Sequence, residues 1–171
     1  MNLNEYVMVL PIANARVCKE LINQYNTDNL HEATSATATG NKVVETHRKC
    51  DTVGINDQRV DDIVWEAHDE YRRRHPLMYC KTQTESQFLR YGPGGKFEEH
   101  VDTYSSAPRT ISVSIILNDD YTGGEFMFFN KELIIKPTVG DVIMFPSNFM
   151  FPHGVMPVKF GTRFAVVNWL N

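Results

Sequence analysis

The chain has 171 residues, of which 42% are hydrophobic and 22% are charged, and its formal net charge is −4 at neutral pH. This composition is typical of a globular protein with one hydrophobic core, because a chain of this length is too short for two substantial ones. The mildly negative charge argues against nucleic acid or an anionic membrane as the main partner.

The N-terminal segment does not resemble a targeting or membrane-spanning sequence. It lacks a basic stretch, and its apolar run over residues 6–12 is too short for a membrane span. Cys18, Cys50 and Cys80 are odd in number and lack Cys-x-x-Cys spacing, which is typical of reduced thiols. We therefore expect a cytoplasmic protein.

The first elements in the chain are a short strand, a helix and a long loop. Residues 4–10 alternate weakly between apolar and polar and predict the strand. Asn14 then offers a capping side chain for a helix over residues 15–25. Residues 27–56 are rich in Ser, Thr, Asn and Asp, and they predict a long loop with one strand near residues 42–45. Loops of this length in a compact domain are usually lids or other functional segments.

The strongest helical pattern covers residues 57–74. Its apolar side chains recur at helical spacing, and Pro76 prevents the helix from continuing. Arg72, Arg73 and Arg74 lie in the last turn, where positive charges complement the helix dipole. We therefore interpret this basic run as a helix end and not as a nucleic-acid-binding patch.

The sequence changes to short strands from about residue 82 onward. They are rich in β-branched and aromatic residues and are separated by Gly and Pro turns. The predicted strands cover residues 86–91, 111–117, 125–129, 132–136, 141–145 and 163–170. Helices followed by a run of strands indicate an α+β protein, in which an antiparallel sandwich or jelly roll carries helices on one face. We expect a single domain over residues 1–171, with supporting helices, strands and loop in 1–81 and the jelly-roll core in 82–171.

Three residues with metal-ligating side chains occur in this strand-rich half. His100 and Asp102 are separated by one residue, so both face the same side of an extended strand. His153 follows much later, after a predicted strand and the turn at Pro146. Two imidazoles and one carboxylate leave one face of a metal open, which suits non-haem Fe(II). A His-x-Asp pair is common by chance, so this interpretation depends on its surroundings.

Arg163 begins the last predicted strand, which is otherwise apolar. A buried guanidinium there needs an anionic partner. Its planar group pairs bidentately with a carboxylate, such as the far end of a dicarboxylic cosubstrate. An internal ion pair with an Asp or Glu is the alternative.

These residues lie in blocks that resemble a known family. The blocks are Arg90-Tyr91, Gly95, Phe97, His100 and Asp102, followed by LNDDYTGGEF, KPTVGDVIMFP, FPHGVMPV and GTRFAVVNWL. In this order and spacing they are similar to the catalytic domain of the Fe(II)- and 2-oxoglutarate-dependent oxygenases of the prolyl 4-hydroxylase type (catalytic alpha-subunit-like). The resemblance covers residues 88–170 and implies a double-stranded β-helix (jelly-roll) core with N-terminal helices packed on one sheet.

The resemblance also implies the roles of five residues. Fe(II) would be held by His100, Asp102 and His153. Arg163 would bind the distal carboxylate of 2-oxoglutarate, and the Tyr91 hydroxyl would donate a hydrogen bond to the same cosubstrate. The implied enzyme is a 2-oxoglutarate-dependent dioxygenase that uses O2, with ascorbate (vitamin C) as reductant, and releases succinate and CO2.

The choice of substrate is expected to lie in the loops over residues 34–56 and 103–109. Arg109 is a candidate for contacting a substrate carboxylate or backbone, with a plain surface arginine as the alternative. Phe126 and Val155 are expected to line the apolar wall of the pocket, or else to pack in the core. The sequence leaves open whether the long polar segment is an ordered wall or a lid.

Hydroxylation of a peptidyl proline, within a peptide or protein partner, is the expected activity. The first alternative keeps the cofactors and changes the substrate to a free amino acid, a small metabolite or another protein side chain. The second is a non-catalytic jelly-roll or cupin-like binding module, which Asp102 and Arg163 disfavour because a cupin would carry His-x-His. Oxidative demethylation of nucleic acid would require a basic surface, which this chain lacks. The oligomeric state stays open.

Overall fold

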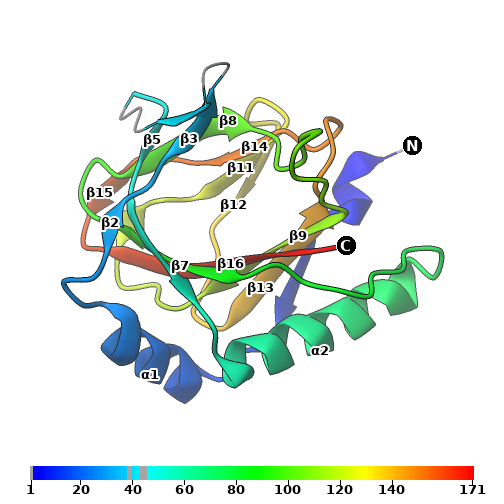
Figure 1. The fold of residues 1–171 in the computed structure, drawn as a ribbon, viewed down its shortest axis with the longest axis horizontal. Coiled ribbons are helices and arrows are strands. Elements are labelled where there is room, and N and C mark those ends of the chain that lie inside the picture. The colour runs from blue at the N-terminus through cyan, green and yellow to red at the C-terminus, as the bar shows by residue number, and fades with distance from the viewer. Residues whose placement is uncertain (1, 38–39, 43–45) are drawn as a thin grey trace.

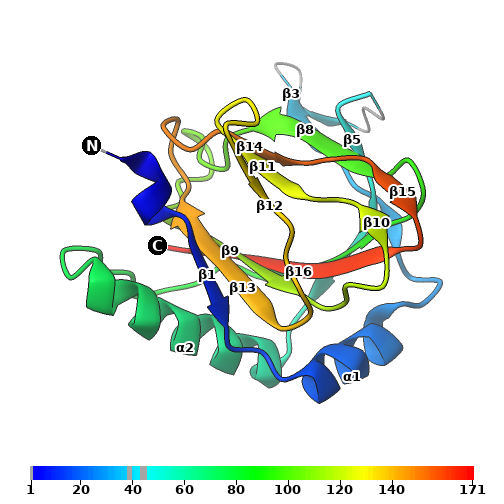
Figure 2. The same ribbon diagram turned by 180° about the vertical axis from the view of Figure 1, so that it is seen from behind.

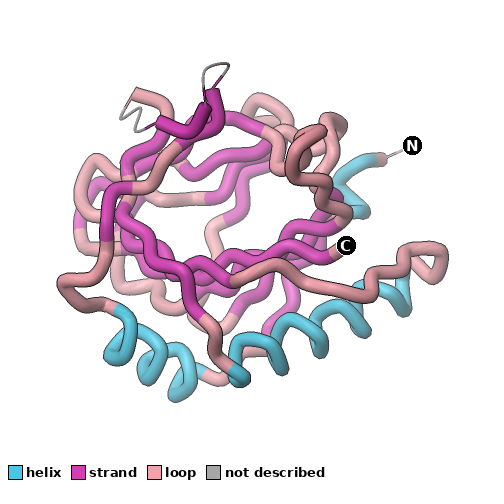
Figure 3. The backbone as a smooth tube through the Cα atoms, in the orientation of Figure 1, coloured by secondary structure: helices cyan, strands magenta, loops and turns pink. Residues whose placement is uncertain are grey.

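Two antiparallel β-sheets face each other, and two helices lie against the outer face of the larger sheet (Figure 1). This computed structural model describes residues 2–37, 40–42 and 46–171. Colouring by secondary structure shows the two long helices on one side of the strands (Figure 3). In the part of the chain that the structure describes, no helix is both long enough and apolar enough to span a membrane.

The helical elements are η1 (Leu3–Tyr6), α1 (Ala15–Tyr25) and α2 (Gln58–Arg74). The Asn14 and Asp57 side chains cap α1 and α2, each accepting a hydrogen bond from the backbone N–H two residues later. Both predicted helices are confirmed, and residue 57 is the cap of α2. The expected strand over residues 4–10 is wrong in its first part. Capping by the Asn2 side chain favours a turn of 3-10 helix there.

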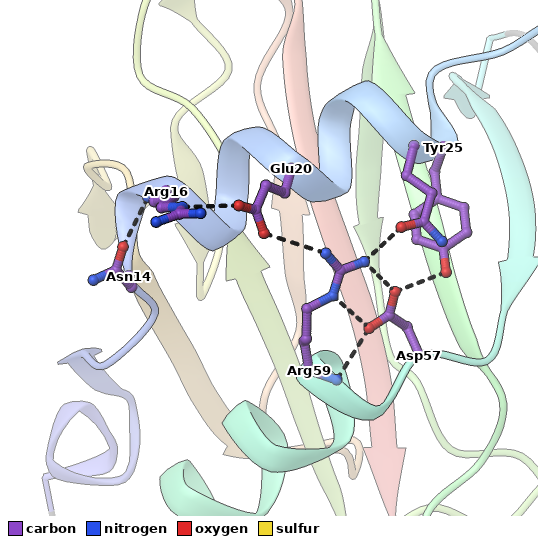
Figure 4. Close-up of polar contacts among 7 residues, drawn as sticks. Asn14, Arg16, Glu20, Tyr25, Asp57 and Arg59 are labelled. Atoms are coloured by element: carbon purple, nitrogen blue, oxygen red, sulfur yellow. Dashed lines mark hydrogen bonds and ion pairs between the residues drawn. The ribbon is translucent and has the colours of Figure 1, made fainter.

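A polar cluster joins the C-terminal half of α1 to the start of α2 (Figure 4). The Arg59 guanidinium lies 2.6 Å from a carboxylate oxygen of Asp57 and 3.5 Å from one of Glu20. It also donates to the Gln24 side chain at 2.6 Å, and the Tyr25 hydroxyl donates to Asp57 at 2.8 Å. These contacts hold the second half of α1 against the start of α2.

The larger sheet has seven strands in the order β1-β13-β9-β16-β7-β6-β2. Its strands are β1 (Met8–Pro11), β2 (His31–Glu32), β6 (Asp51–Ile55), β7 (Ser86–Tyr91), β9 (Ile111–Ile116), β13 (Asp141–Pro146) and β16 (Arg163–Leu170). Seen from behind, β1 and β13 lie side by side above the helices (Figure 2). The predicted strands over residues 86–91, 111–117, 141–145 and 163–170 are confirmed to within one residue.

The smaller sheet has five strands in the order β12-β11-β14-β8-β5. Its strands are β5 (Arg48–Lys49), β8 (Lys96–His100), β11 (Phe126–Phe128), β12 (Leu133–Ile135) and β14 (His153–Val155). Two small pairs add β3 (Ser35–Thr37) with β4 (Gly40–Lys42), and β10 (Thr122–Gly123) with β15 (Val158–Phe160). The predicted strands over residues 125–129 and 132–136 are confirmed with shorter bounds.

The long loop expected over residues 27–56 is wrong as a description of this segment. Its described residues form five short strands, and β6 pairs with β7 along its whole length. Thr52, Val53 and Ile55 favour an extended chain, and the pairing supplies its hydrogen bonds. The strand expected near residues 42–45 meets β4 only at Lys42, and residues 43–45 lie outside the described part of the chain.

Strand β9 separates two apolar clusters. Ile111, Val113 and Ile115 pack in the cluster that includes α1 and α2 side chains, whereas Ile116 packs in the cluster between the sheets. Because successive side chains alternate along a strand, Ser112 and Ser114 also face the space between the sheets. The two facing sheets and the helices on one of them make this an α+β double-stranded β-helix, as expected.

Candidate metal centre and adjoining cavity

The structure brings His100, Asp102 and His153 together between the two sheets. His100 ends β8 and is the cross-strand partner of His153, which begins β14. Asp102 lies in a bend just beyond β8 and still faces the same space, although the strand does not extend to it. One ligand atom from each residue lies within 4.8 Å of the other two. This spacing allows all three side chains to bind one metal ion.

Backbone carbonyls orient the two imidazoles. His100 Nδ1 lies 2.8 Å from the carbonyl oxygen of Glu98, and His153 Nδ1 lies 3.1 Å from that of Phe151. A carbonyl only accepts, so each Nδ1 carries the proton, and each Nε2 presents its lone pair to the centre. Burial lowers the pKa of His100, which keeps that imidazole neutral as a metal ligand must be.

Asp102 is held as a carboxylate by its neighbours. Burial alone would raise its pKa, but the charge that the histidines carry when protonated, that of His153 above all, holds the pKa of Asp102 well below its usual range, and a bound metal ion would supply positive charge at the same place. The two Nε2 atoms approach it at 3.5 Å from His100 and 3.4 Å from His153. The Ser112 hydroxyl donates to Asp102 Oδ2 at 2.6 Å and lies 2.8 Å from the Ser147 hydroxyl. Such partners fix the direction of a metal-binding carboxylate.

Aromatic rings surround the imidazoles. The Phe97 ring stacks on His100 with 3.5 Å between centroids, and Phe145 meets His153 edge-on at 4.5 Å. These contacts restrict ring rotation, so the Nε2 atoms keep their direction. The donor set of two nitrogens and one carboxylate, with its ligands already oriented, fits Fe(II).

A cavity of about 190 Å³ adjoins the three residues. Drug-sized ligands usually occupy roughly 300–1,000 Å³, so this cavity suits a smaller molecule. Phe126 and Val155 both line it, as expected from the sequence. Its polar lining comes from the following residues: Thr34, Arg48, Gln87, Tyr91, Tyr104, Arg109, Ser112, Ser114 and Arg163.

Arg163 is a buried cation at one end of this cavity. Its side chain is 1% exposed, and among the described residues its Nε and Nη2 atoms have no hydrogen-bond partner. The internal ion pair considered as an alternative is not found in the part of the chain that the structure describes. Gly124 makes room for it, since a Cβ there would lie 3.1 Å from Arg163 Cδ. A buried guanidinium without a partner fits a carboxylate of a bound ligand.

Tyr91 is the cross-strand partner of Arg163 in the pairing of β7 with β16. Its ring lies 5.3 Å from the guanidinium carbon, and its side chain lines the same cavity. Burial raises the pKa of Tyr91, so its hydroxyl stays protonated and can donate a hydrogen bond. Arg163 and Tyr91 therefore present adjacent donors to one end of the cavity.

Arg109 lines the same cavity and contacts two other lining residues, Trp169 and Asp102. Its guanidinium carbon stacks 3.5 Å from the Trp169 ring, and its Nη1 donates to the backbone carbonyl of Asp102 at 3.1 Å. Its Nε has no partner among the described residues. The structure thus brings Arg109 into the cavity lining together with the other predicted site residues.

The lining or supporting residues that the sequence analysis missed include Arg48, Ser112, Ser147 and Trp169. Alternation along the predicted strand over residues 111–117 could have placed Ser112 on the inner face. Arg48 lies in the segment predicted as a loop. Ser147 comes close to Asp102 only because the end of β13 packs beside residue 102. Neither has a signal in the sequence.

Comparison with protein families gives a match over residues 86–171 to the model described as 2OG-Fe(II) oxygenase superfamily. Among curated proteins, a PKHD-type hydroxylase of Prochlorococcus marinus (strain MIT 9215) is 31% identical over 131 residues, 72% of this chain and 53% of that protein. Prolyl 3-hydroxylase 2 of Homo sapiens is 41% identical over 68 residues, 37% of this chain and 10% of that protein. The chain therefore spans about half the length, or less, of these curated relatives.

Solved structures share the fold across nearly the whole chain. A prolyl-4-hydroxylase of Pseudomonas putida superposes with a TM-score of 0.76 at 21% identity, covering 97% of this chain and 92% of that chain. A viral collagen prolyl hydroxylase from Paramecium bursaria Chlorella virus-1, solved as its 2OG complex, gives 0.75 at 19% identity, covering 96% and 95%. These similarities confirm the expected double-stranded β-helix.

Proposed function

This chain belongs to the 2OG-Fe(II) oxygenase superfamily, and we propose that it hydroxylates an unactivated C–H bond of a peptidyl proline. The reaction would use Fe(II), 2-oxoglutarate and O2 and would release succinate and CO2. The observation that carries this proposal is the buried Arg163 guanidinium, whose Nε and Nη2 have no partner among the described residues and which lines the same cavity as His100, Asp102 and His153. The same cavity therefore offers three ligands for a metal and a cation for a carboxylate.

In this proposal His100, Asp102 and His153 hold Fe(II). When bound, the iron would activate O2 with electrons that come from Fe(II) and from the oxidation of 2-oxoglutarate, and the protein supplies orientation. The two backbone carbonyls keep both Nε2 lone pairs directed at the metal. Ser112 and Ser147 keep the Asp102 carboxylate in place. The centre is therefore oriented by groups that do not themselves touch the metal.

Arg163 and Tyr91 anchor the distal carboxylate of 2-oxoglutarate in this proposal. The buried guanidinium gains an ionic partner, and the neutral Tyr91 hydroxyl donates a further hydrogen bond. Phe126 and Val155 give the cavity an apolar wall that limits water around the reacting carbon. Arg109, beside Asp102, contacts the substrate.

The names of the relatives support a proline substrate. The structural neighbours from Pseudomonas putida and the Chlorella virus are named prolyl hydroxylases. A further neighbour, from Trichoplax adhaerens, was solved with a hypoxia inducible factor peptide fragment and gives a TM-score of 0.75 at 18% identity. We infer a peptide or protein partner on this basis. The three free cysteines support a location in the reducing cytoplasm.

A direct test measures succinate formation by the purified protein with Fe(II), 2-oxoglutarate, ascorbate and a panel of proline-containing peptides. Mass spectrometry of each peptide then detects the addition of one oxygen atom. We expect metal- and 2-oxoglutarate-dependent turnover that is absent from the His100→Ala variant. A protein that binds neither Fe(II) nor 2-oxoglutarate would contradict the proposal. Oxidation of free proline alone would contradict the peptidyl substrate and favour a small-molecule hydroxylase.

A further inference from the structure

The charges that line the cavity are not balanced by the proposed metal and cosubstrate. Arg48, Arg109 and Arg163 all line it, and Asp102 is the one carboxylate residue among the described lining residues. Asp102 faces the two imidazoles, and Arg163 faces the cosubstrate end. Two guanidinium groups therefore remain without a counter-charge.

Arg48 reaches the cavity from the smaller sheet. It lies on β5, and its guanidinium carbon stacks 4.6 Å from the Phe97 ring. Its Nη1 donates to the backbone carbonyl of Thr34 at 3.1 Å, and its Nε lies 3.3 Å from Cys50 Sγ. No carboxylate among the described residues pairs with it, so these contacts hold the group in place without neutralising it.

Arg109 reaches the cavity from the segment that leads into β9, in the larger sheet. It is fixed in the same manner, by stacking on Trp169 and by a hydrogen bond to a backbone carbonyl. Its Nε is buried and has no partner among the described residues. Two rigid cations thus enter one cavity from opposite sheets.

The two groups face the same small cavity. An arginine stays protonated at physiological pH, so in the absence of substrate two like charges repel each other across this space. A buried anion between the two cations would remove this repulsion.

We propose that the substrate carries a carboxylate close to the carbon that is hydroxylated, and that Arg48 and Arg109 bind this carboxylate. The inference rests on the proposed function, because it names the substrate class of the same site. A planar guanidinium matches a carboxylate in geometry as well as in charge. The carboxylate has three possible sources, an acidic side chain beside the target residue, a C-terminus, or a free amino acid.

The test compares ligands that differ only in this charge. Four ligands are compared. Two proline peptides with an amidated C-terminus carry either Glu or Gln beside the proline. The third peptide carries Gln beside a proline that is its last residue and has a free carboxylate, and the fourth ligand is free proline. Dissociation constants are measured by calorimetry with Fe(II) and 2-oxoglutarate present and oxygen excluded. We expect at least one carboxylate ligand to bind about tenfold or more tightly than the Gln peptide, since hydrogen bonds from a guanidinium to a carboxylate are about twice as strong as those to a neutral amide.

Substitutions of the two arginines test whether these residues cause the preference for a carboxylate ligand. Arg48→Gln and Arg109→Gln should each reduce the preference for the carboxylate, and the double Arg48→Glu, Arg109→Glu variant should prefer a matched Lys peptide. Arg72→Gln, which removes an exposed cation on α2 outside the larger sheet, is the charge control and should keep the wild-type preference. Thermal melting checks that each variant is folded. If a variant does not fold, the wild-type ligand series still decides.

Equal affinity for the Glu, Gln, free C-terminal and proline ligands would overturn the inference. It would leave the proposed function intact if Fe(II) and 2-oxoglutarate still bind and substrate-free succinate formation is still measured. Preference for a carboxylate found only with free proline would support the two-arginine site and contradict the peptidyl substrate.

Discussion

His100 and His153 are direct cross-strand partners in the pairing of β8 with β14, and their ring centroids lie 4.4 Å apart. The backbone hydrogen bonds of two neighbouring strands therefore set the separation of the imidazoles. Strand pairing alone therefore brings two of the three proposed ligands close enough to share one metal ion. Ligands that the backbone already holds close together lose less conformational entropy on binding.

Removal of the Ser112 hydroxyl should weaken metal binding. Ser112→Ala leaves Asp102 without its shortest hydrogen bond, and loss of such a partner lowers metal affinity by about 10–100-fold. Titration with Fe(II), with oxygen excluded, measures the change. Ser114→Ala is the matched control, since Ser114 is buried on the same face of β9 and its hydroxyl has no partner among the described residues. Equal effects of the two substitutions would contradict the role of Ser112.

Replacement of Arg163 should weaken the binding of 2-oxoglutarate and at the same time increase the stability of the folded protein. Arg163→Met should weaken 2-oxoglutarate binding by about 100-fold, because loss of one partner of a buried charge pair costs about 2–5 kcal/mol. Without ligand the same variant should be more stable than the wild type by about 1–4 kcal/mol, because it removes an uncompensated buried charge. Thermal melting with and without 2-oxoglutarate measures both effects. An equal ligand-induced rise in melting temperature in both proteins would exclude Arg163 from the cosubstrate site.

A methyl group at Gly124 should displace Arg163. Gly124 has φ +67°, and an added Cβ would lie 3.1 Å from Arg163 Cδ and 3.0 Å from Tyr121 Cε2. Gly124→Ala should therefore destabilise the protein by about 1 kcal/mol or more and weaken 2-oxoglutarate binding. Gly92→Ala is the control, because an added Cβ there meets nothing within 4 Å. Calorimetric titration measures the affinity of both variants for 2-oxoglutarate. Unchanged affinity in Gly124→Ala would show that the position of the Arg163 side chain does not depend on this glycine.

The pH dependence of stability should report the cluster in Figure 4. The hydrogen bond from Arg59, with a further one from Tyr25, lowers the pKa of Asp57 to about 2 from 3.8. Since the folded pKa lies below the unfolded one, this stabilisation is present above about pH 4 and is lost as the pH falls toward 2. Asp57→Asn keeps a capping side chain and should lose about 2 kcal/mol at pH 7, with the difference shrinking toward pH 2.

Urea unfolding of Asp57→Asn and the wild type at several pH values measures this difference. Asp62→Asn, which removes an exposed carboxylate from the same helix, is the control and should change stability little at any pH. A difference for Asp57→Asn that stays constant with pH would show that its cause is packing and not charge.

The sequence predicted the parts of the molecule that depend on local pattern. Both helices carry their caps and apolar faces in the sequence, and the strand over residues 163–170 is continuous enough to be recognised alone. His100 and Asp102 could be paired because their spacing places both on one side of an extended chain. Arg163 stood out because a cation in an apolar strand requires an anion.

The remaining parts depend on contacts between distant segments. Strand β6 lies in a polar segment and becomes a strand because β7 supplies its hydrogen bonds. Strands β8 and β14 have only a few residues each and are fixed by pairing with one another. Arg48 enters the cavity through the position of β5 beside β8, so no pattern near residue 48 could indicate its role.

The alternation of side chains along β9 has a consequence for how this protein can vary. The outward side chains of Ile111, Val113 and Ile115 contribute to the free energy of folding, and the inward Ser112 steers a ligand of the metal. Substitutions on the outward face can therefore adjust thermal tolerance while the chemistry is preserved. Deletion of one residue within β9 would exchange the two faces, so stability and activity would be lost together.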